Sequence, residues 1–271
     1  MLTTFDYLAP ENKEQLFDLL DENREGVSLL SGGTDLLVDI RNGIVSPDTV
    51  VDIKKIEEFG RLTFDESEGL SIGAAVTCAE LINNQAVQKK FPFLIEAAED
   101  LASPQLRNRA TVVGNVCKAS PCGDMSRILL ALEATAVISS SKGSREVALE
   151  DFFTGVQKTV LEDNEIMEKI VVPAEMTEFK GGNKKLKRIK GHDLALASVS
   201  VVKNSKKMNI AIGSCCTTPV LIKDLDPDIP ANKLCEIIDE TIAPIDDQRA
   251  SKEYRVFMVK NYAKKLLAEL N

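Results

Sequence analysis

The chain has 271 residues, of which 44% are apolar and 28% are charged, and its 33 Lys and Arg against 42 Asp and Glu give a net charge of -9. This length and apolar fraction are typical of a globular protein of one to three domains with a substantial core. The acidic balance argues against nucleic acid as a partner, because phosphate binding requires clustered basic side chains. Only the stretch from Lys184 to Lys190 is locally basic.

Several classes of protein are excluded by single features of the sequence. No apolar run reaches the roughly 18 residues that a membrane span needs, and Met1 to Asp6 lack the regions of a signal peptide, so we expect a cytoplasmic location. His192 is the only histidine, which excludes His-rich zinc sites. The sequence has no Gly-x-Ser-x-Gly elbow, so it does not indicate a triad hydrolase. The six scattered cysteines are interpreted as mostly reduced thiols without a metal.

The first 55 residues predict a small β-α-β unit, because buried strand runs alternate with helical spacing of apolar residues. Its predicted elements, in chain order, are a helix over residues 10 to 22, a strand over 27 to 30, a glycine turn over 31 to 35, a helix over 36 to 40 and a strand over 49 to 53.

Residues 56 to 175 predict a mixed α+β pattern, with Thr77 and Glu80 as a capping box. We expect strands on both sides of a turn at 65 to 69, a helix over 93 to 101, a loop over 102 to 124, a helix over 125 to 133, a hairpin from 135 to 149 and a strand over 165 to 172.

Residues 176 to 271 form the third predicted domain. The Lys- and Gly-rich segment from 179 to 185 is interpreted as a domain boundary or exposed loop. A hairpin over 195 to 214 and helices at 231 to 242 and 246 to 270 follow.

The glycine turn from Ser31 to Asp35 has two readings. Adjacent glycines after a buried strand let backbone N–H groups approach an anion such as a pyrophosphate, and a following helix adds a favourable dipole. The turn matches neither Gly-x-Gly-x-x-Gly nor the P-loop pattern, so neither of those folds is indicated. A tight turn that uses glycine for its positive φ explains the same residues without a ligand.

A second segment, from Arg107 to Asp124, is rich in Thr, Asn, Ser and Asp. Hydroxyl and amide groups on a long loop can bind a polyhydroxylated ligand, and long loops in compact domains are often functional. Asp124 either accepts hydrogen bonds from sugar hydroxyls or is a plain helix N-cap, and the sequence leaves both roles open.

Three motifs resemble the FAD-binding subunit of the molybdenum hydroxylases, the medium-subunit family of xanthine dehydrogenase and carbon monoxide dehydrogenase. They are Ser-Gly-Gly-Thr-Asp-Leu-Leu at 31 to 37, Arg-Asn-x-Ala-Thr-Val-x-Gly-Asn at 107 to 115 and Ala-Ser-Pro-x-x-Asp at 119 to 124. Further matches follow in the right order at 70 to 77, 193 to 195, 211 to 213 and 251 to 255.

This resemblance implies an α+β fold. The two-subdomain FAD-binding fold of the p-cresol methylhydroxylase-like type would occupy residues 1 to 55 and 56 to 175, and a carboxy-terminal antiparallel sheet with helices would occupy 176 to 271. The cofactor would be FAD.

The resemblance also implies which residues bind FAD. The first loop would wrap the pyrophosphate through Leu29, Leu30, Ser31, Gly32, Gly33, Thr34, Asp35 and Leu36. The second would use Thr111, Gly114, Asn115 and Ser120, with Asp124 on the ribityl or ribose hydroxyls. Leu101 and Met167 match positions that pack around the cofactor, and Lys185 or Lys187 matches a basic residue near it. Val113 departs from the family, which usually has glycine there.

By the same resemblance the chain is an electron-transfer oxidoreductase subunit with no catalytic acid or base of its own. Its partners would be a small subunit with [2Fe–2S] clusters and a large subunit with the molybdenum cofactor, and its FAD would pass electrons to an acceptor such as NAD+. Two alternatives stay open: a stand-alone FAD-dependent oxidase or reductase, and an assembly module of the same fold that has lost FAD.

Overall fold

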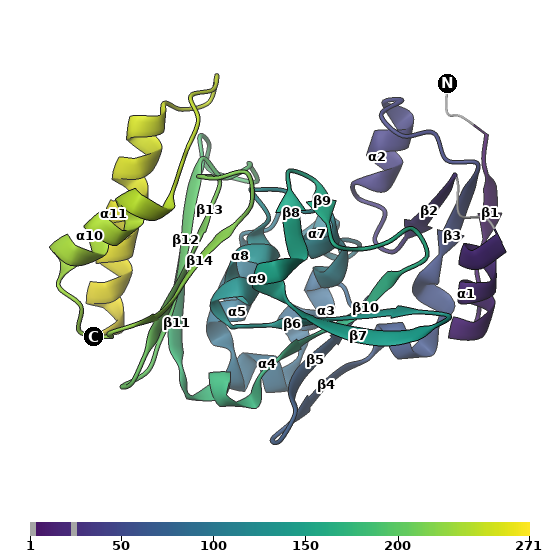
Figure 1. The fold of residues 1–271 in the computed structure, drawn as a ribbon, viewed down its shortest axis with the longest axis horizontal. Coiled ribbons are helices and arrows are strands. Elements are labelled where there is room, and N and C mark those ends of the chain that lie inside the picture. Colours follow the sequence, from purple (N-terminus) through teal and green to yellow (C-terminus); the bar gives the residue numbers. More distant parts are fainter. Residues whose placement is uncertain (1–3, 23–25) are drawn as a thin grey trace.

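The computed structural model describes residues 4–22 and 26–271. Its described part has three main sheets, which follow one another along the long axis from the amino-terminal to the carboxy-terminal end (Figure 1). No helix in these ranges is long and apolar enough to cross a membrane. The three sheets draw their strands from residues 6–52, 62–172 and 180–225, while the division into domains at 55 and 175 stays a prediction.

The first sheet is parallel, with strand order β1-β3-β2, and it confirms the predicted β-α-β unit. Crossover helices join its strands because parallel neighbours cannot be linked by a tight turn. The carboxyl ends of β2 and β3 therefore lie at one edge, and the glycine turn follows β2 there. The elements are β1 (Asp6–Leu8), α1 (Lys13–Glu22), β2 (Val27–Leu30), α2 (Leu36–Arg41) and β3 (Thr49–Asp52).

The second sheet is antiparallel, with order β4-β5-β10-β6-β7. Its strands are β4 (Leu62–Asp65), β5 (Gly69–Gly73), β6 (Thr135–Ser140), β7 (Gly143–Ala148) and β10 (Ile166–Val172), and a small ribbon pairs β8 (Phe153–Gly155) with β9 (Lys158–Thr159). The helices of this part of the chain are α3 (Cys78–Asn83), α4 (Gln85–Lys90), α5 (Pro92–Glu99), α6 (Pro104–Arg107), α7 (Val112–Cys117), α8 (Asp124–Ala131) and α9 (Leu149–Phe152). Thr77 and Glu80 form the predicted capping box of α3.

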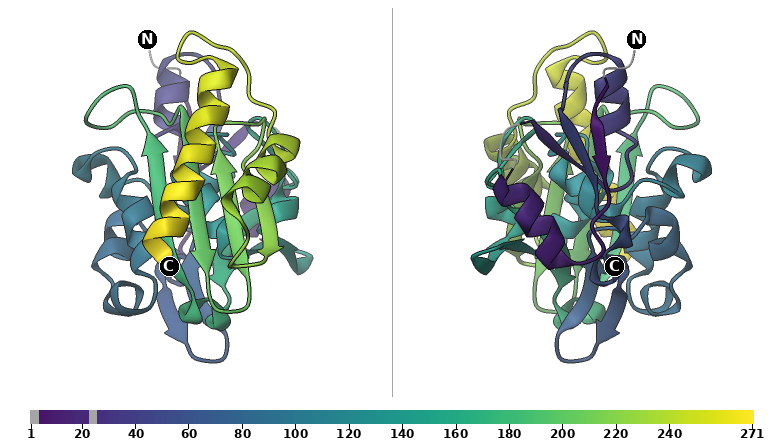
Figure 2. Two further views of the ribbon diagram at one scale, coloured as in Figure 1. Left: turned by 90° about the vertical axis from the view of Figure 1, so that its left-hand side faces the viewer. Right: turned by 90° about the vertical axis from the view of Figure 1, so that its right-hand side faces the viewer.

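Helix α8 is the centre of the molecule, and every one of its residues is buried. It packs against α5 and α7, which belong to the same part of the chain as the second sheet, and against strands β12 and β13 of the third sheet. The third sheet, with order β11-β12-β13-β14, carries α10 and α11 on its other face (Figure 2). Its elements are β11 (Lys180–Leu186), β12 (Ala197–Lys203), β13 (Met208–Gly213), β14 (Val220–Leu225), α10 (Ala231–Thr241) and α11 (Lys252–Leu270).

The predicted loop over residues 102 to 124 is wrong, because two short helices, α6 and α7, lie within it. Ser103 caps α6, with Pro104 in the first turn. Thr111 caps α7 by accepting a hydrogen bond from the backbone N–H of Gly114 at 3.2 Å. Hydroxyl caps of this kind satisfy the free N–H groups of a first turn, so a Ser/Thr-rich segment can start helices that apolar spacing does not indicate.

The alternative of an exposed loop at 179 to 185 is also wrong, since residues 180 to 186 form strand β11, while the domain boundary near this segment stays a prediction. The strand pairs with β12 from Lys180 to Leu186. Its glycines have a packing reason: a Cβ on Gly181 would lie 2.7 Å from the Phe93 ring, and one on Gly182 would lie 2.9 Å from Leu266. Glycine here permits close packing of α5 and α11 against the strand.

The last helix begins at Lys252, not at 246, because the residues before it form a turn around Asp247. Arg255 of α11 is 1% exposed and reaches this turn, donating to Asp247 Oδ1 at 2.8 Å and to the carbonyls of Leu196 and Ser214. Burial opposes ionisation of Asp247, but hydrogen bonds from the N–H groups of Arg249 and Ala250 and the nearby guanidinium groups hold its pKa well below the ordinary range.

Replacing this arginine should destabilise the chain. Arg255→Met leaves the Leu196 and Ser214 carbonyls without their donor, and we expect it to lower the free energy of unfolding by about 3 kcal/mol. Urea unfolding at pH 7 measures the change. Lys252→Met, on an exposed position of the same helix, is the control and should change it by no more than about 0.5 kcal/mol; equal effects of both variants would contradict the role given to Arg255.

Candidate cofactor-binding cleft

A cleft of about 690 Å³ opens where all three parts of the fold meet. This volume lies in the range of small-molecule sites. The predicted residues that line it are Leu29, Ser31, Gly32, Gly33, Thr34, Asp35, Leu36, Leu101, Thr111, Gly114, Asn115, Ser120, Asp124 and Lys185. Segments more than 150 residues apart in sequence, such as Ser31 and Lys185, therefore share one surface.

The first glycine loop presents a row of unpaired backbone donors. Within the described chain, the N–H groups from Gly32 to Leu36 donate to no acceptor, although Gly33 and Asp35 accept bonds from Leu37 and Asp39 through their carbonyls. Gly33 has φ 73°, as a tight turn that uses glycine requires. The same turn leaves its N–H groups unpaired, so the two interpretations are compatible. Unpaired N–H groups before a helix are suited to an anionic ligand.

The two glycine-containing loops are in direct contact. A Cβ on Gly32 would lie 2.2 Å from the carbonyl oxygen of Arg109, a separation that only glycine avoids. The second loop is held from its other side, since Cys78 N–H donates to the Ala110 carbonyl at 2.8 Å and Val112 N–H donates to the Val76 carbonyl at 3.0 Å. The position of one loop therefore depends on the other.

Polar side chains of the second loop hold its backbone in shape. Besides the Thr111 cap, Asn115 Oδ1 accepts from the N–H of Met125 at 3.1 Å, and Ser120 Oγ accepts from the N–H of Cys122 at 3.2 Å. Val113 is 3% exposed in α7 and packs in the core. Its side chain lies outside the cleft lining, which explains how the chain accommodates a Cβ at this family glycine.

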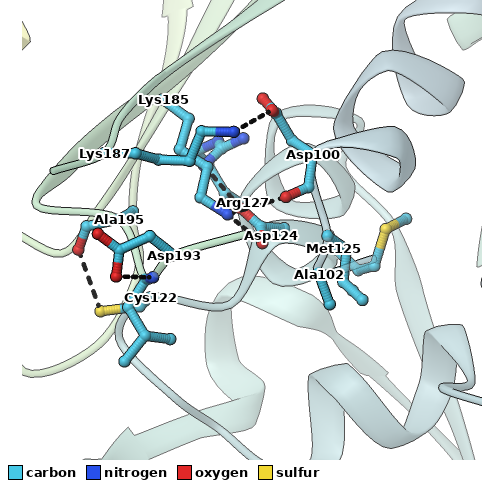
Figure 3. A network of polar contacts seen from close by, with 12 residues as sticks. Asp100, Ala102, Cys122, Asp124, Met125, Arg127, Lys185, Lys187, Asp193 and Ala195 are labelled. Atoms are coloured by element: carbon cyan, nitrogen blue, oxygen red, sulfur yellow. Dashed lines mark hydrogen bonds and ion pairs between the residues drawn. The ribbon is translucent and has the colours of Figure 1, made fainter. Parts of the chain in front are cut away.

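Asp124 lines the cleft and lies between two cations, Lys185 and Arg127 (Figure 3). Its Oδ2 accepts from Lys185 Nζ at 2.8 Å, and its Oδ1 lies 3.7 Å from Arg127 Nη1. Lys185 also donates to the carbonyl of Asp100 at 3.0 Å. The alternative role of Asp124 as an N-cap is wrong, because Gly123 occupies that position and Asp124 is the first residue of α8.

This cluster is almost completely buried, and its charges are not balanced. The side chains of Lys185 and Arg127 are 2% and 0% exposed. Burial raises the pKa of Asp124, an effect that Arg127 and Lys185 oppose, and burial lowers the pKa of Arg127. Among described residues, Asp124 Oδ1 and both Nη atoms of Arg127 lack a hydrogen-bond partner. Unpaired buried groups are costly, so the cluster is suited to further polar contacts.

Three of the predicted residues lie outside the cleft lining. Leu30 packs with Ile40 and Val50 in a core cluster of the first unit. Met167 is 1% exposed within the central core. The Nζ of Lys187 lies 3.4 Å from Oδ1 of Asp100 (Figure 3). Their part in cofactor binding stays a prediction.

Sequence reasoning missed other residues of the lining. Lys118 and Asp39 form an ion pair at 2.6 Å that joins the second loop to α2. His192 lines the cleft beside Asp193 and Leu194. The signal for His192 was its position directly before the family motif at 193 to 195, whereas nothing in the sequence indicates the pairing of Lys118 with Asp39.

The cleft also contains two thiols, those of Cys117 and Cys122. All six cysteines are free in this structure, and their redox state stays a prediction. Burial raises the pKa of the Cys117 thiol to about 12, so this group stays protonated at neutral pH and is a poor nucleophile.

Comparisons with known proteins agree with this geometry. Residues 3–175 match the model of the FAD binding domain in molybdopterin dehydrogenase. The chain is 30% identical to the glyceraldehyde dehydrogenase medium chain of Sulfolobus acidocaldarius over 98% of both chains. It is 35% identical to the carbon monoxide dehydrogenase medium chain of Hydrogenophaga pseudoflava over 73% of this chain and 68% of that one.

A solved structure extends the similarity to the whole fold. A chain of the Hydrogenophaga pseudoflava carbon monoxide dehydrogenase that lacks the Mo-pyranopterin moiety superposes with a TM-score of 0.91. The sequence identity is 28%, and the match covers 100% of this chain and 98% of that one. The predicted α+β fold, with its carboxy-terminal antiparallel sheet, is therefore confirmed.

The buried cluster makes a testable prediction about stability and pH. Lys185→Met leaves Asp124 with a more distant cation only, and we expect a loss of about 3 kcal/mol in the free energy of unfolding at pH 7. Because burial raises the pKa of Asp124 in the folded chain, the protonated carboxyl is the form that folding tolerates. The variant should therefore recover stability as the pH falls and lose it as the pH rises through that pKa.

Urea unfolding at a series of pH values, from about pH 4, near the ordinary pKa of an aspartate, to about pH 8, tests this prediction. Lys187→Met, which removes a more exposed cation, is the matched control and should change stability by about 1 kcal/mol or less. A Lys185→Met deficit that does not diminish in acid would contradict the role given to Asp124.

Proposed function

Since this chain belongs to the family of FAD-binding domains of molybdopterin dehydrogenases, we propose that it is the FAD-carrying electron-transfer subunit of a molybdenum hydroxylase complex. The observation that carries the proposal is the row of unpaired N–H groups from Gly32 to Leu36, because these residues all line the cleft between the two glycine-containing loops. FAD is the cofactor of the family, and its pyrophosphate is an anion of the kind that such a row binds.

The residues of the cleft suit the different parts of FAD. The N–H groups of the first loop would hold the pyrophosphate. Asp124 and Ser120 would accept hydrogen bonds from ribityl or ribose hydroxyls, since carboxylate and hydroxyl oxygens are acceptors. Leu29 and Leu101 offer apolar surface to a ring system. The unpaired Oδ1 of Asp124 supports a polar ligand at this end of the cleft.

The chemistry of the subunit belongs to the cofactor. When bound, FAD can accept electrons one at a time and release them two at a time, which links one-electron carriers to a two-electron acceptor. The residues of this chain bind it, orient it and set the charge around it. Lys185 and Arg127 outnumber the carboxylate of Asp124, and this excess positive charge favours a cofactor that gains electrons. No catalytic acid or base is required.

The partners complete the proposal. Electrons would reach this chain from the [2Fe–2S] clusters of a small subunit, which receives them from a large subunit with the molybdenum cofactor, and would leave to an acceptor such as NAD+. The similar proteins reported above are named medium chains of dehydrogenases, which supports a multi-subunit assembly. We place this assembly in the cytoplasm.

Purification from the native host tests the proposal against both alternatives. We expect FAD, iron and molybdenum to co-purify with the chain, and the assembly to reduce NAD+ or another acceptor. A yellow chain that oxidises a substrate without partners would favour the stand-alone oxidase or reductase. A chain that binds no FAD after saturation with added cofactor would favour the assembly module.

Gly32→Ala is predicted to weaken FAD binding at least tenfold. The added Cβ would meet the Arg109 carbonyl at 2.2 Å, which pushes the two loops apart and removes N–H groups from the pyrophosphate. Titration of the FAD-free chain with FAD, followed by flavin fluorescence, measures the change. Gly60→Ala is the control, because a Cβ there has no neighbour within 4 Å, and it should bind FAD as the unaltered chain does.

A further inference from the structure

We propose that Lys54 is a positioning residue for the first glycine loop, although it lies outside the cleft lining. Its Nζ donates to the carbonyl oxygen of Ser31 at 3.0 Å. This carbonyl accepts no other hydrogen bond within the described chain. Lys54 therefore holds the peptide unit between Ser31 and Gly32, where the row of unpaired N–H groups begins. The inference rests on the proposed function and adds a residue to it.

The geometry of a trans peptide makes this contact relevant to the ligand. The described chain has no cis peptide bond, and in a trans peptide the C=O of one residue and the N–H of the next point in opposite directions. With the Ser31 carbonyl turned toward Lys54, the N–H of Gly32 points away from Lys54. A rotation of this peptide would replace the donor by a carbonyl oxygen, which repels a pyrophosphate.

The carbonyl of the peptide between Ser31 and Gly32 has only the hydrogen bond from Lys54, whereas the rest of the loop has other restraints. The carbonyls of Gly33 and Asp35 accept bonds from the first turns of α2. The side chain of Ser31 donates to the carbonyl of Ala74 at 2.9 Å, which anchors the Cα but leaves the following peptide free to rotate. A residue without a Cβ follows, and glycine has a wider range of backbone conformations than other residues, so this peptide has less local restraint on its orientation.

Lys54 is itself held in place by β3. Asp52 at the end of that strand accepts from Lys54 Nζ at 2.7 Å through each carboxylate oxygen, and its Oδ1 also accepts from the backbone N–H of Lys54. Tyr7 of β1 donates to Asp52 Oδ2 at 2.6 Å. The chain of contacts runs from the parallel sheet to the loop, so the sheet determines the direction of the Gly32 N–H.

The experiment compares Lys54→Met, Lys54→Arg and Lys55→Met in the full chain, after removal of FAD and titration with FAD. Lys55 is the matched control, since it is the exposed neighbour and its side chain has no hydrogen bond or ion pair with the described residues. We expect Lys54→Met to raise the Kd for FAD about tenfold, as for the loss of one charge-assisted restraint. Lys54→Arg should restore most of the affinity, and Lys55→Met should leave it unchanged.

A second readout separates loop orientation from general damage to the fold. The ³¹P resonances of the bound pyrophosphate should shift in Lys54→Met and keep their positions in Lys55→Met, while both variants keep the circular dichroism spectrum of the unaltered chain without FAD. An unchanged Kd in Lys54→Met, or a raised Kd with unmoved ³¹P resonances, would overturn the inference. If the unaltered chain itself binds no FAD, this outcome contradicts the proposed function and, with it, the role of Lys54. If only Lys54→Met behaves like the unaltered chain, the role of Lys54 alone is contradicted.

Discussion

The contact between Gly32 and the carbonyl of Arg109 is the constraint on which the candidate site depends. At this point two backbones approach so closely that a Cβ has no room, and each loop is tied to a different sheet. The first follows the parallel strand β2, and the second is bonded to the segment after β5. The parallel and antiparallel parts of the fold are thus joined at the place where a ligand would bind. Both glycine-containing loops can then face the same pyrophosphate.

The carboxy-terminal unit contributes through charge. Lys185 extends from β11 to Asp124 on α8 (Figure 3), and Arg127 reaches Ser200 of β12 at 2.7 Å from the same helix. A buried helix with an ionised residue at its start needs such partners, because an isolated buried charge is very costly. The same contacts therefore stabilise the packing of the third sheet and leave positive charge beside the cleft. A change in this sheet could alter the cofactor's environment without touching the glycine loops.

Much of the candidate site could be predicted because loop motifs carry local chemistry. Gly32 and Gly33 mark a turn with free N–H groups, and the order of the motifs points to a single family. The residues that contact this site from distant segments could not be predicted from the sequence. Lys118 with Asp39 and Lys54 with Ser31 are contacts between segments 79 and 23 residues apart, and no sequence period relates them. Short capped helices at 104 and 112 were missed because four to six residues are too few to show helical spacing.

The sequence by itself determined the elements with a clear period, the capping box of Thr77 and Glu80, the glycine turn, and the family to which they belong. These depend on neighbours within a few residues, so local propensity decides them. Only the tertiary structure decided that the Lys- and Gly-rich segment is strand β11, that Asp124 accepts from Lys185, and which residues line the cleft. Glycines 181 and 182 lie in a strand because the Phe93 ring and Leu266 pack against them, and packing between distant segments overrides local preference.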